Sequence, residues 1–192
     1  MKTIVATFAA FGLAILVTPL AAIAMGTADE AALAQALRQA QLPLERGIAV
    51  SSREGTPISA KYELEDDGDE LQLSVYTMKE NEYVFDYESG DVTTRAPAFS
   101  EVIVEYLSGT ISKVIPIKDS EDLAAARNQS AAMAQAKRSL EVATAQAVSA
   151  HDGYRAVSAT PELRNGRAAA KVILIRGNEW TTAYEWLDQE AP

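Results

Sequence analysis

Apolar and polar positions follow the same succession of patterns twice along the chain. Over residues 30–40 apolar side chains recur at steps of three and four, which predicts an amphipathic helix. The pattern then changes to alternation, which predicts short strands ending near Val92. From residue 121 a second helical pattern leads again into alternating segments, which end near Leu187. We therefore predict a tandem repeat.

The first unit alternates over residues 58–65, 71–76 and 83–87. The Asp-Asp-Gly-Asp turn at 66–69 joins the first two segments, because glycine tolerates a positive φ. Hairpins give antiparallel pairing, so we expect a three-stranded sheet with one helix on one face. The other face of this sheet should be mostly exposed to solvent. It carries Lys61, Glu63, Gln72, Ser74 and Asp86.

The second unit begins with a helix that either runs to Ala150 or breaks near Ser139. The Arg-Asn-Gly-Arg turn at 164–167 is a strong hairpin signal between two strands. On the last strand four side chains, three of them aromatic, share one face: Trp180, Thr182, Tyr184 and Trp186. We expect the second face of this sheet to carry side chains too apolar for water, which meet the linker or a partner. These are Ile173, Ile175, Ala183 and Leu187.

The predicted fold class is α+β, built from two helix-plus-three-stranded antiparallel units. Unit 1 spans residues 25–95 and unit 2 spans residues 120–192. Residues 96–119 form either a linker or extra strands, since so short an apolar run does not distinguish strand from helix.

The N-terminus is predicted to be a signal peptide, residues 1–24. Lys2 gives the positive end, residues 4–17 are uncharged and mostly apolar, and Ala22-Ile23-Ala24 is a small-x-small site for cleavage after Ala24. The alternative is an uncleaved anchor, because a membrane span needs about 20 apolar residues. Cleavage would place the protein in a bacterial periplasm or outside the cell.

Composition narrows the function classes. The chain of 192 residues has a formal net charge of −10, so phosphate backbones repel it and nucleic acid is a poor partner. It contains no cysteine, which excludes disulfides, thiol catalysis and a cysteine-ligated metal. We predict no cofactor and no metal.

Catalytic groups are scarce. His151 is the only histidine, and its place beside Asp152-Gly153 is typical of a helix C-terminus rather than of a catalytic triad. The acidic run at residues 65–70 lies on a hairpin turn, where carboxylates stay solvated, whereas catalytic pairs need burial. Weak calcium binding there stays open, although the Asp-x-Asp-x-Asp-Gly spacing of a calcium loop is absent. We predict that the protein is not an enzyme.

Two aromatic stripes are the candidate partner-binding residues. One comprises Tyr83, Phe85 and Tyr87, and the other comprises Trp180, Tyr184 and Trp186. Aromatic stripes on strands belong either to a core or to an interface, where aromatic residues are enriched.

The layout resembles the PepSY domain family, in which a helix precedes a β-meander whose third strand ends in an Asp-x-x-x-Gly-x-Val turn. The matching segment runs from Asp86 through Gly90 to Val92. Unit 2 is similar in its helix and in Asn165-Gly166, but Asp188 is not followed by a glycine. The resemblance implies a non-catalytic exported module that inhibits a secreted peptidase or binds another envelope protein. The alternative function is a periplasmic protein that binds a small ligand or a divalent ion.

Overall fold

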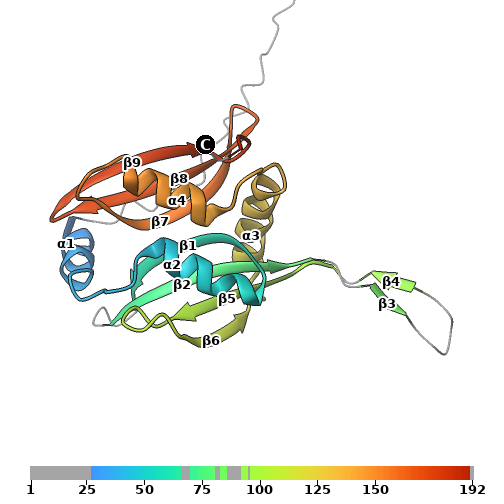
Figure 1. Cartoon of the computed structure of the whole chain (residues 1–192). Coiled ribbons are helices and arrows are strands. Elements are labelled where there is room, and N and C mark those ends of the chain that lie inside the picture. The colour runs from blue at the N-terminus through green and yellow to red at the C-terminus, as the bar shows by residue number, and fades with distance from the viewer. Residues whose placement is uncertain (1–26, 66–69, 81–82, 86–91, 95, 191–192) are drawn as a thin grey trace, which may run out of the picture.

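The computed structural model describes residues 27–65, 70–80, 83–85, 92–94 and 96–190. Seven strands form one antiparallel sheet in the order β6-β5-β2-β1-β7-β8-β9 (Figure 1). The strands of this sheet are β1 (Thr56–Leu64), β2 (Leu71–Lys79), β5 (Ala98–Val104), β6 (Ile111–Pro116), β7 (Arg155–Arg164), β8 (Arg167–Arg176) and β9 (Glu179–Trp186). The helices are α1 (Thr27–Ala36), α2 (Leu44–Ser51), the short 3-10 helix η1 (Ser52–Glu54), α3 (Ser120–Met133) and α4 (Leu140–Ser149).

The sheet consists of two meanders that meet at its centre. β1, β2, β5 and β6 form one meander and β7, β8 and β9 form the other. β1 pairs with β7 through Ala60 opposite Ala159 and Lys61 opposite Ser158. A β-bulge lies at the third residue of both central strands, Ile58 in β1 and Val157 in β7. The two bulged strands lie side by side at the junction of the meanders.

One face of the sheet, which we call the core face, carries α2 and α4. Strand residues such as Ala60, Val75 and Val172 point to this face and are fully buried. The helices meet them with a larger set of buried apolar side chains: Leu44, Ile48, Leu140, Ala143 and Ala147. Both halves of the chain therefore share one hydrophobic core, which burial of apolar surface stabilises.

Helix α3 packs on the opposite face, which we call the α3 face and which carries Ser59, Lys61 and Tyr76. The Ser59 hydroxyl donates to Gln129 Oε1 of α3 at 2.9 Å. α3 begins where Asp119 accepts hydrogen bonds from the first backbone N–H groups of the helix.

The prediction of an α+β fold is confirmed. The helical segment 121–150 breaks into α3 and α4, so the alternative of a break near Ser139 is confirmed. Ser139 itself caps α4 by accepting from the Val142 backbone N–H at 3.2 Å.

The helix α2 is not predicted by the sequence patterns, and Gly47 lies within it. Pro43 precedes the helix, where its missing N–H costs no intrahelical hydrogen bond. A Cβ at Gly47 would lie 2.5 Å from Leu73 Cδ2, so the glycine allows α2 to approach β2 closely. Its role is packing.

The prediction that residues 83–87 form the third strand of the first sheet is wrong. Tyr83–Phe85 is β3, which pairs with β4 (Val92–Thr94) in a separate two-stranded sheet that extends from the body (Figure 1). The neighbour of β2 is β5, which buries Phe99, Val102 and Val104.

Two predictions about the second faces also need correction. In the first unit Ser74 is fully buried and Ser59 nearly so, so this face is only partly wet. In the second unit Ala183 pairs with Val172 and thus lies on the core face, whereas Ile173 pairs with Thr182 on the α3 face. The two-residue turn between β8 and β9 sets this register, which alternation within each strand does not reveal.

Arg155 links the two halves. Its guanidinium donates to the carbonyl oxygens of Leu37 at 2.7 Å, Ala40 at 3.0 Å and Leu42 at 3.3 Å, and lies 5.7 Å from the ring centre of Tyr62. These carbonyls lie beyond the C-terminal turn of α1, where backbone acceptors lack intrahelical partners.

We expect Arg155→Met to lower the free energy of unfolding by about 2–4 kcal/mol, because three acceptors lose a charged donor. Urea unfolding followed by tryptophan fluorescence measures the change. Arg127→Met, at an exposed site on α3, is the control and should stay within about 0.5 kcal/mol of the wild type. Equal effects of the two variants would contradict the linking role of Arg155.

Candidate partner-binding face

The aromatic residues of β9 lie on the α3 face at one edge of the sheet. Trp180, Tyr184 and Trp186 stand opposite Ile175, Lys171 and Ala169 of β8, which confirms that they share one face. The Tyr184 side chain is 41 % exposed, and the two tryptophans are half-buried. β9 has β8 as its only strand partner in the described sheet, so its outer side is an edge.

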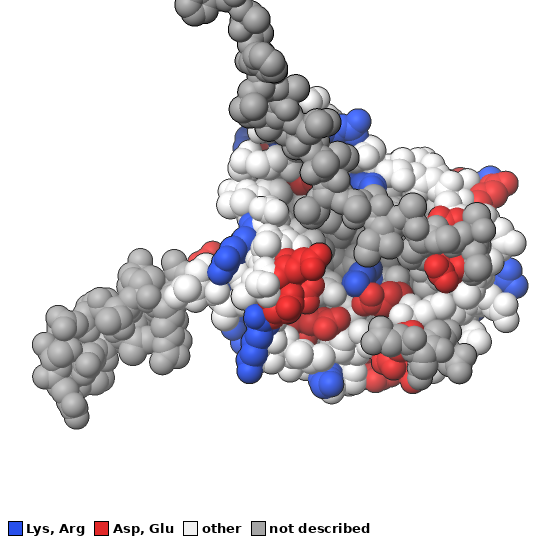
Figure 2. All heavy atoms as spheres, turned by 180° about the vertical axis from the view of Figure 1, so that it is seen from behind, with Lys and Arg blue, Asp and Glu red and all other residues white. Residues whose placement is uncertain are grey.

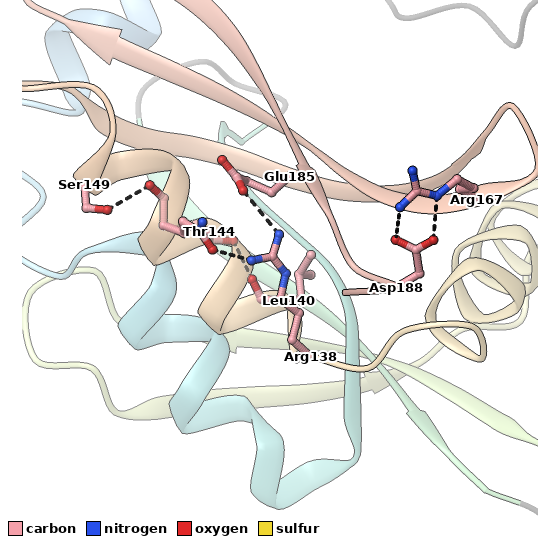
Figure 3. A network of polar contacts seen from close by, with 8 residues as sticks. Arg138, Leu140, Thr144, Ser149, Arg167, Glu185 and Asp188 are labelled. Carbon is pink, nitrogen blue, oxygen red and sulfur yellow. Dashed lines mark hydrogen bonds and ion pairs between the residues drawn. The ribbon is translucent and has the colours of Figure 1, made fainter. Parts of the chain in front are cut away.

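Two arginines from the β7–β8 hairpin stack on these rings. The Arg164 guanidinium carbon lies 3.9 Å from the ring centre of Tyr184, and that of Arg167 lies 4.3 Å from Trp186. Arg167 also donates two hydrogen bonds to Asp188, at 2.7 and 2.9 Å (Figure 3). This pair raises the pKa of Arg167 and lowers the pKa of Asp188. The geometry is that of cation–π contact, which holds the rings in defined orientations.

The core side of β9 is fixed by a buried arginine (Figure 3). Arg138, whose side chain is only 5 % exposed, donates to Glu185 at 3.2 Å and to the side chain of Gln146 in α4. The Leu187 carbonyl accepts from the backbone N–H groups of Lys137 and Arg138. Because these contacts hold one side of the strand, the aromatic side chains on its other side are preorganised.

The structure places the predicted site residues in two separate regions. Tyr83 and Phe85 lie on β3, in the hairpin that extends from the body, while the three aromatic residues of unit 2 lie on β9 (Figure 1). Tyr87 lies outside the described residues, as do Asp86 and Gly90 of the family turn motif. The two stripes are therefore not brought into one sheet, and the candidate face is that of β9.

A second polar cluster on the α3 face was not singled out from the sequence. Lys61 Nζ lies 2.5 Å from Glu63 Oε2 and 5.7 Å from the ring centre of Tyr76, whose hydroxyl donates to Glu101 at 3.5 Å. Burial raises the pKa of Tyr76 to about 12, although Lys61 opposes the shift. Burial alone would lower the pKa of Lys61, but the hydrogen bond to Glu63 and the nearby charges outweigh it and raise the pKa.

Only alternation within each strand marked this cluster, because its lysine, tyrosine and two glutamates lie on three neighbouring strands. In the sequence each of them is indistinguishable from an ordinary solvated position. Acidic side chains gather near the middle of the molecule on the side seen in Figure 2, with basic side chains beside them. The cluster thus combines opposite charges with partial burial, which sequence alternation does not show.

The single histidine lies just beyond the C-terminal end of α4. His151 Nδ1 lies 2.7 Å from the Ala147 carbonyl, so the predicted place at a helix C-terminus is confirmed. Within the part of the chain that the structure describes, no group of three acidic, histidine or cysteine side chains is arranged to hold a metal ion. The acidic turn 66–69 lies outside that part. None of the described helices is long and apolar enough to cross a bilayer.

Comparison with protein-family models, with curated proteins and with solved structures finds no match to this chain.

The pKa values of Tyr62, which is buried, and Tyr76, which is half-buried, predict how the stability of the protein depends on pH. Burial raises the pKa of Tyr62 and of Tyr76 to about 12, against about 10 in an unfolded chain. Between these values the folded state binds more protons than the unfolded state, so stability is fully present below about pH 10 and falls as the pH rises toward about 12.

We expect Tyr76→Phe to reduce the slope of this loss by up to about 1.4 kcal/mol per pH unit, and Tyr62→Phe to act in the same direction. Urea unfolding at a series of values from about pH 9 to about pH 11.5 measures the slope. A slope in Tyr76→Phe identical to that of the wild type would refute the assignment.

Proposed function

We propose that the protein is an exported, non-enzymatic interaction module that binds another envelope or secreted protein through the α3 face of β9. The observation that carries this proposal is the exposure of Tyr184 beside half-buried Trp180 and Trp186 on an edge strand. Tyrosine, tryptophan and arginine are the residues most enriched among those that dominate binding energy at interfaces.

The arrangement suits an extended segment of a partner. An open strand edge offers backbone donors and acceptors, and the ring face next to it offers pockets for alternate side chains. The β9 sequence contains no proline or lysine, residues that commonly protect edge strands from pairing, whereas β6 at the opposite edge contains Lys113 and Pro116. The difference between the two edges supports β9 as the binding edge.

A PepSY-like role is part of the same proposal. In both halves helices precede an antiparallel meander, and the central strands carry matching bulges. This repetition supports the helix-then-meander layout of the resemblance, and with it a partner such as a peptidase. A signal peptide cut after Ala24 would bring the protein to the compartment of such a partner.

The alternative function is binding of a small ligand, and a cavity beneath α3 favours it. This cavity lies on the same face as the aromatic residues of β9 but over different strands, so the two functions are separable.

A photo-crosslinking amino acid at position 184 should capture a partner in the native envelope, and the same amino acid at Val142 should not. Val142 is the matched control, because it is 39 % exposed on α4 and α4 lies on the core face. Trp186→Ala should reduce the yield from position 184 by about tenfold or more, since it removes an aromatic anchor. Equal capture from positions 184 and 142 would contradict a specific face on β9.

Export predicts a mature chain that begins at Met25. Intact-mass measurement of the protein from its own cells, after separation of membrane and soluble envelope fractions, tests this directly. Full-length chain in the membrane fraction would favour the uncleaved anchor instead.

A further inference from the structure

A cavity of about 200 Å³ lies between α3 and the strands β1, β2 and β7. Its floor is formed by Ser59, Lys61, Tyr76 and Thr160 of the sheet. Its roof is formed by Asp122, Ala125, Ala126 and Gln129 of α3. A wider hollow lined by Lys61, Tyr76 and Asp122 continues from it along β1 and β2. Alanine at two successive roof positions leaves the space open.

Several polar groups that line the cavity can donate hydrogen bonds. Lys61 contacts Glu63, and its ammonium group has further N–H donors. The Gln129 side chain accepts from Ser59 through its oxygen, so its amide nitrogen is left as a donor. The Thr160 hydroxyl lies on the same face, because Thr160 follows Ser158, the partner of Lys61, by two residues. The donors are suited to a carboxylate or carbonyl oxygen.

The charges around the cavity disfavour a simple anion. Asp122 stands on the roof, and none of the ion pairs between described residues includes it. Glu63 lies in the adjoining hollow. A ligand that carries only a carboxylate would be attracted by Lys61 but repelled by Asp122 and Glu63. A ligand that also carries an ammonium group would be attracted by these two carboxylates.

Size limits the ligand further. Pockets for drug-sized ligands have volumes of about 300–1,000 Å³. A cavity of about 200 Å³ therefore suits a smaller molecule. We propose that this cavity binds a small zwitterion, an α-amino acid or the end of a short peptide, with its carboxylate on Lys61 and its ammonium group on Asp122. The site uses no residue of β9, so it deepens the small-ligand function independently of the partner-binding face.

Titration calorimetry with the purified chain tests the proposal. The probes are alanine and alanylalanine, with propionate and ethylamine as half-ligands that carry only one charge. We expect the zwitterions to bind at least about tenfold more tightly than either half-ligand, because each charged contact adds affinity. Zwitterion binding no tighter than about 1 mM, or half-ligands that bind as tightly as alanine, would overturn the proposal.

Variants locate the site. Lys61→Met and Asp122→Asn should each weaken alanine binding by about tenfold or more. Glu121→Gln, in the same helical turn as Asp122 but not lining the cavity, and Lys113→Met, on β6, are matched controls that should bind like the wild type. Wild-type affinity in the Lys61 or Asp122 variant, or equal losses in the controls, would overturn the assignment.

A cavity-filling variant covers the case in which Lys61→Met fails to fold. Ala125→Leu adds bulk from the helix side and keeps all charges, so circular dichroism should stay unchanged while alanine binding is lost. Undiminished binding in a folded Ala125→Leu protein would exclude this cavity. Crosslinking from position 184 does not require this cavity. A failure of alanine to bind would therefore not decide whether β9 binds a partner.

Discussion

The pairing of β1 with β7 is the contact on which the rest of the structure depends. It joins the two meanders through Ala60 opposite Ala159 and Lys61 opposite Ser158. Helices α2 and α4 lie against each other on the core face above this junction. Small residues lie in this contact region: Gly47 lets α2 approach Leu73 of β2, and Ala143 and Ala147 of α4 are fully buried. Larger side chains such as Leu44 and Leu140 fill the remaining core.

The same junction determines where functional surface is left. Since α2 and α4 cover the core face, α3 takes the opposite face, over β7, β1 and β8. Seven strands about 4.8 Å apart span about 29 Å, whereas a helix is about 10–12 Å across. One helix thus leaves both margins of this face uncovered. The β9 aromatic residues lie on one margin, and the hollow beside Lys61 opens toward the other.

Local patterns in the sequence were sufficient for most strands and insufficient for their pairing. Alternation located β1, β2 and β8, because it reflects one-sided burial within a single strand. It did not decide that β5 rather than β3 pairs with β2, since alternation within one strand does not indicate which strand lies beside it. It also misplaced Ala183, because the face of a residue relative to the next strand depends on the number of turn residues.

The candidate sites were predictable to different degrees for the same reason. The three aromatic residues of β9 follow from alternation within one strand, so their common face was evident from the sequence. The Lys61 cavity combines β1, β2, β7 and α3, which are distant in the sequence, so only the fold assembles it. The three carbonyl acceptors of Arg155 likewise carry no sequence signal, because backbone oxygens are present at every residue.

The two halves of the chain contribute unequally to the contacts at the junction. Arg155 is the first residue of β7, and the corresponding first residue of β1 is Thr56, whose short side chain is exposed. Arg155 is long enough to reach the connection between α1 and α2 in the first half and to donate to its carbonyl groups. The second unit also contributes α3, which covers the junction from the other face. Arg155 and α3 both belong to the second half and contact the first, and one core cluster contains residues of both halves, so the core is closed only when the two halves pack together.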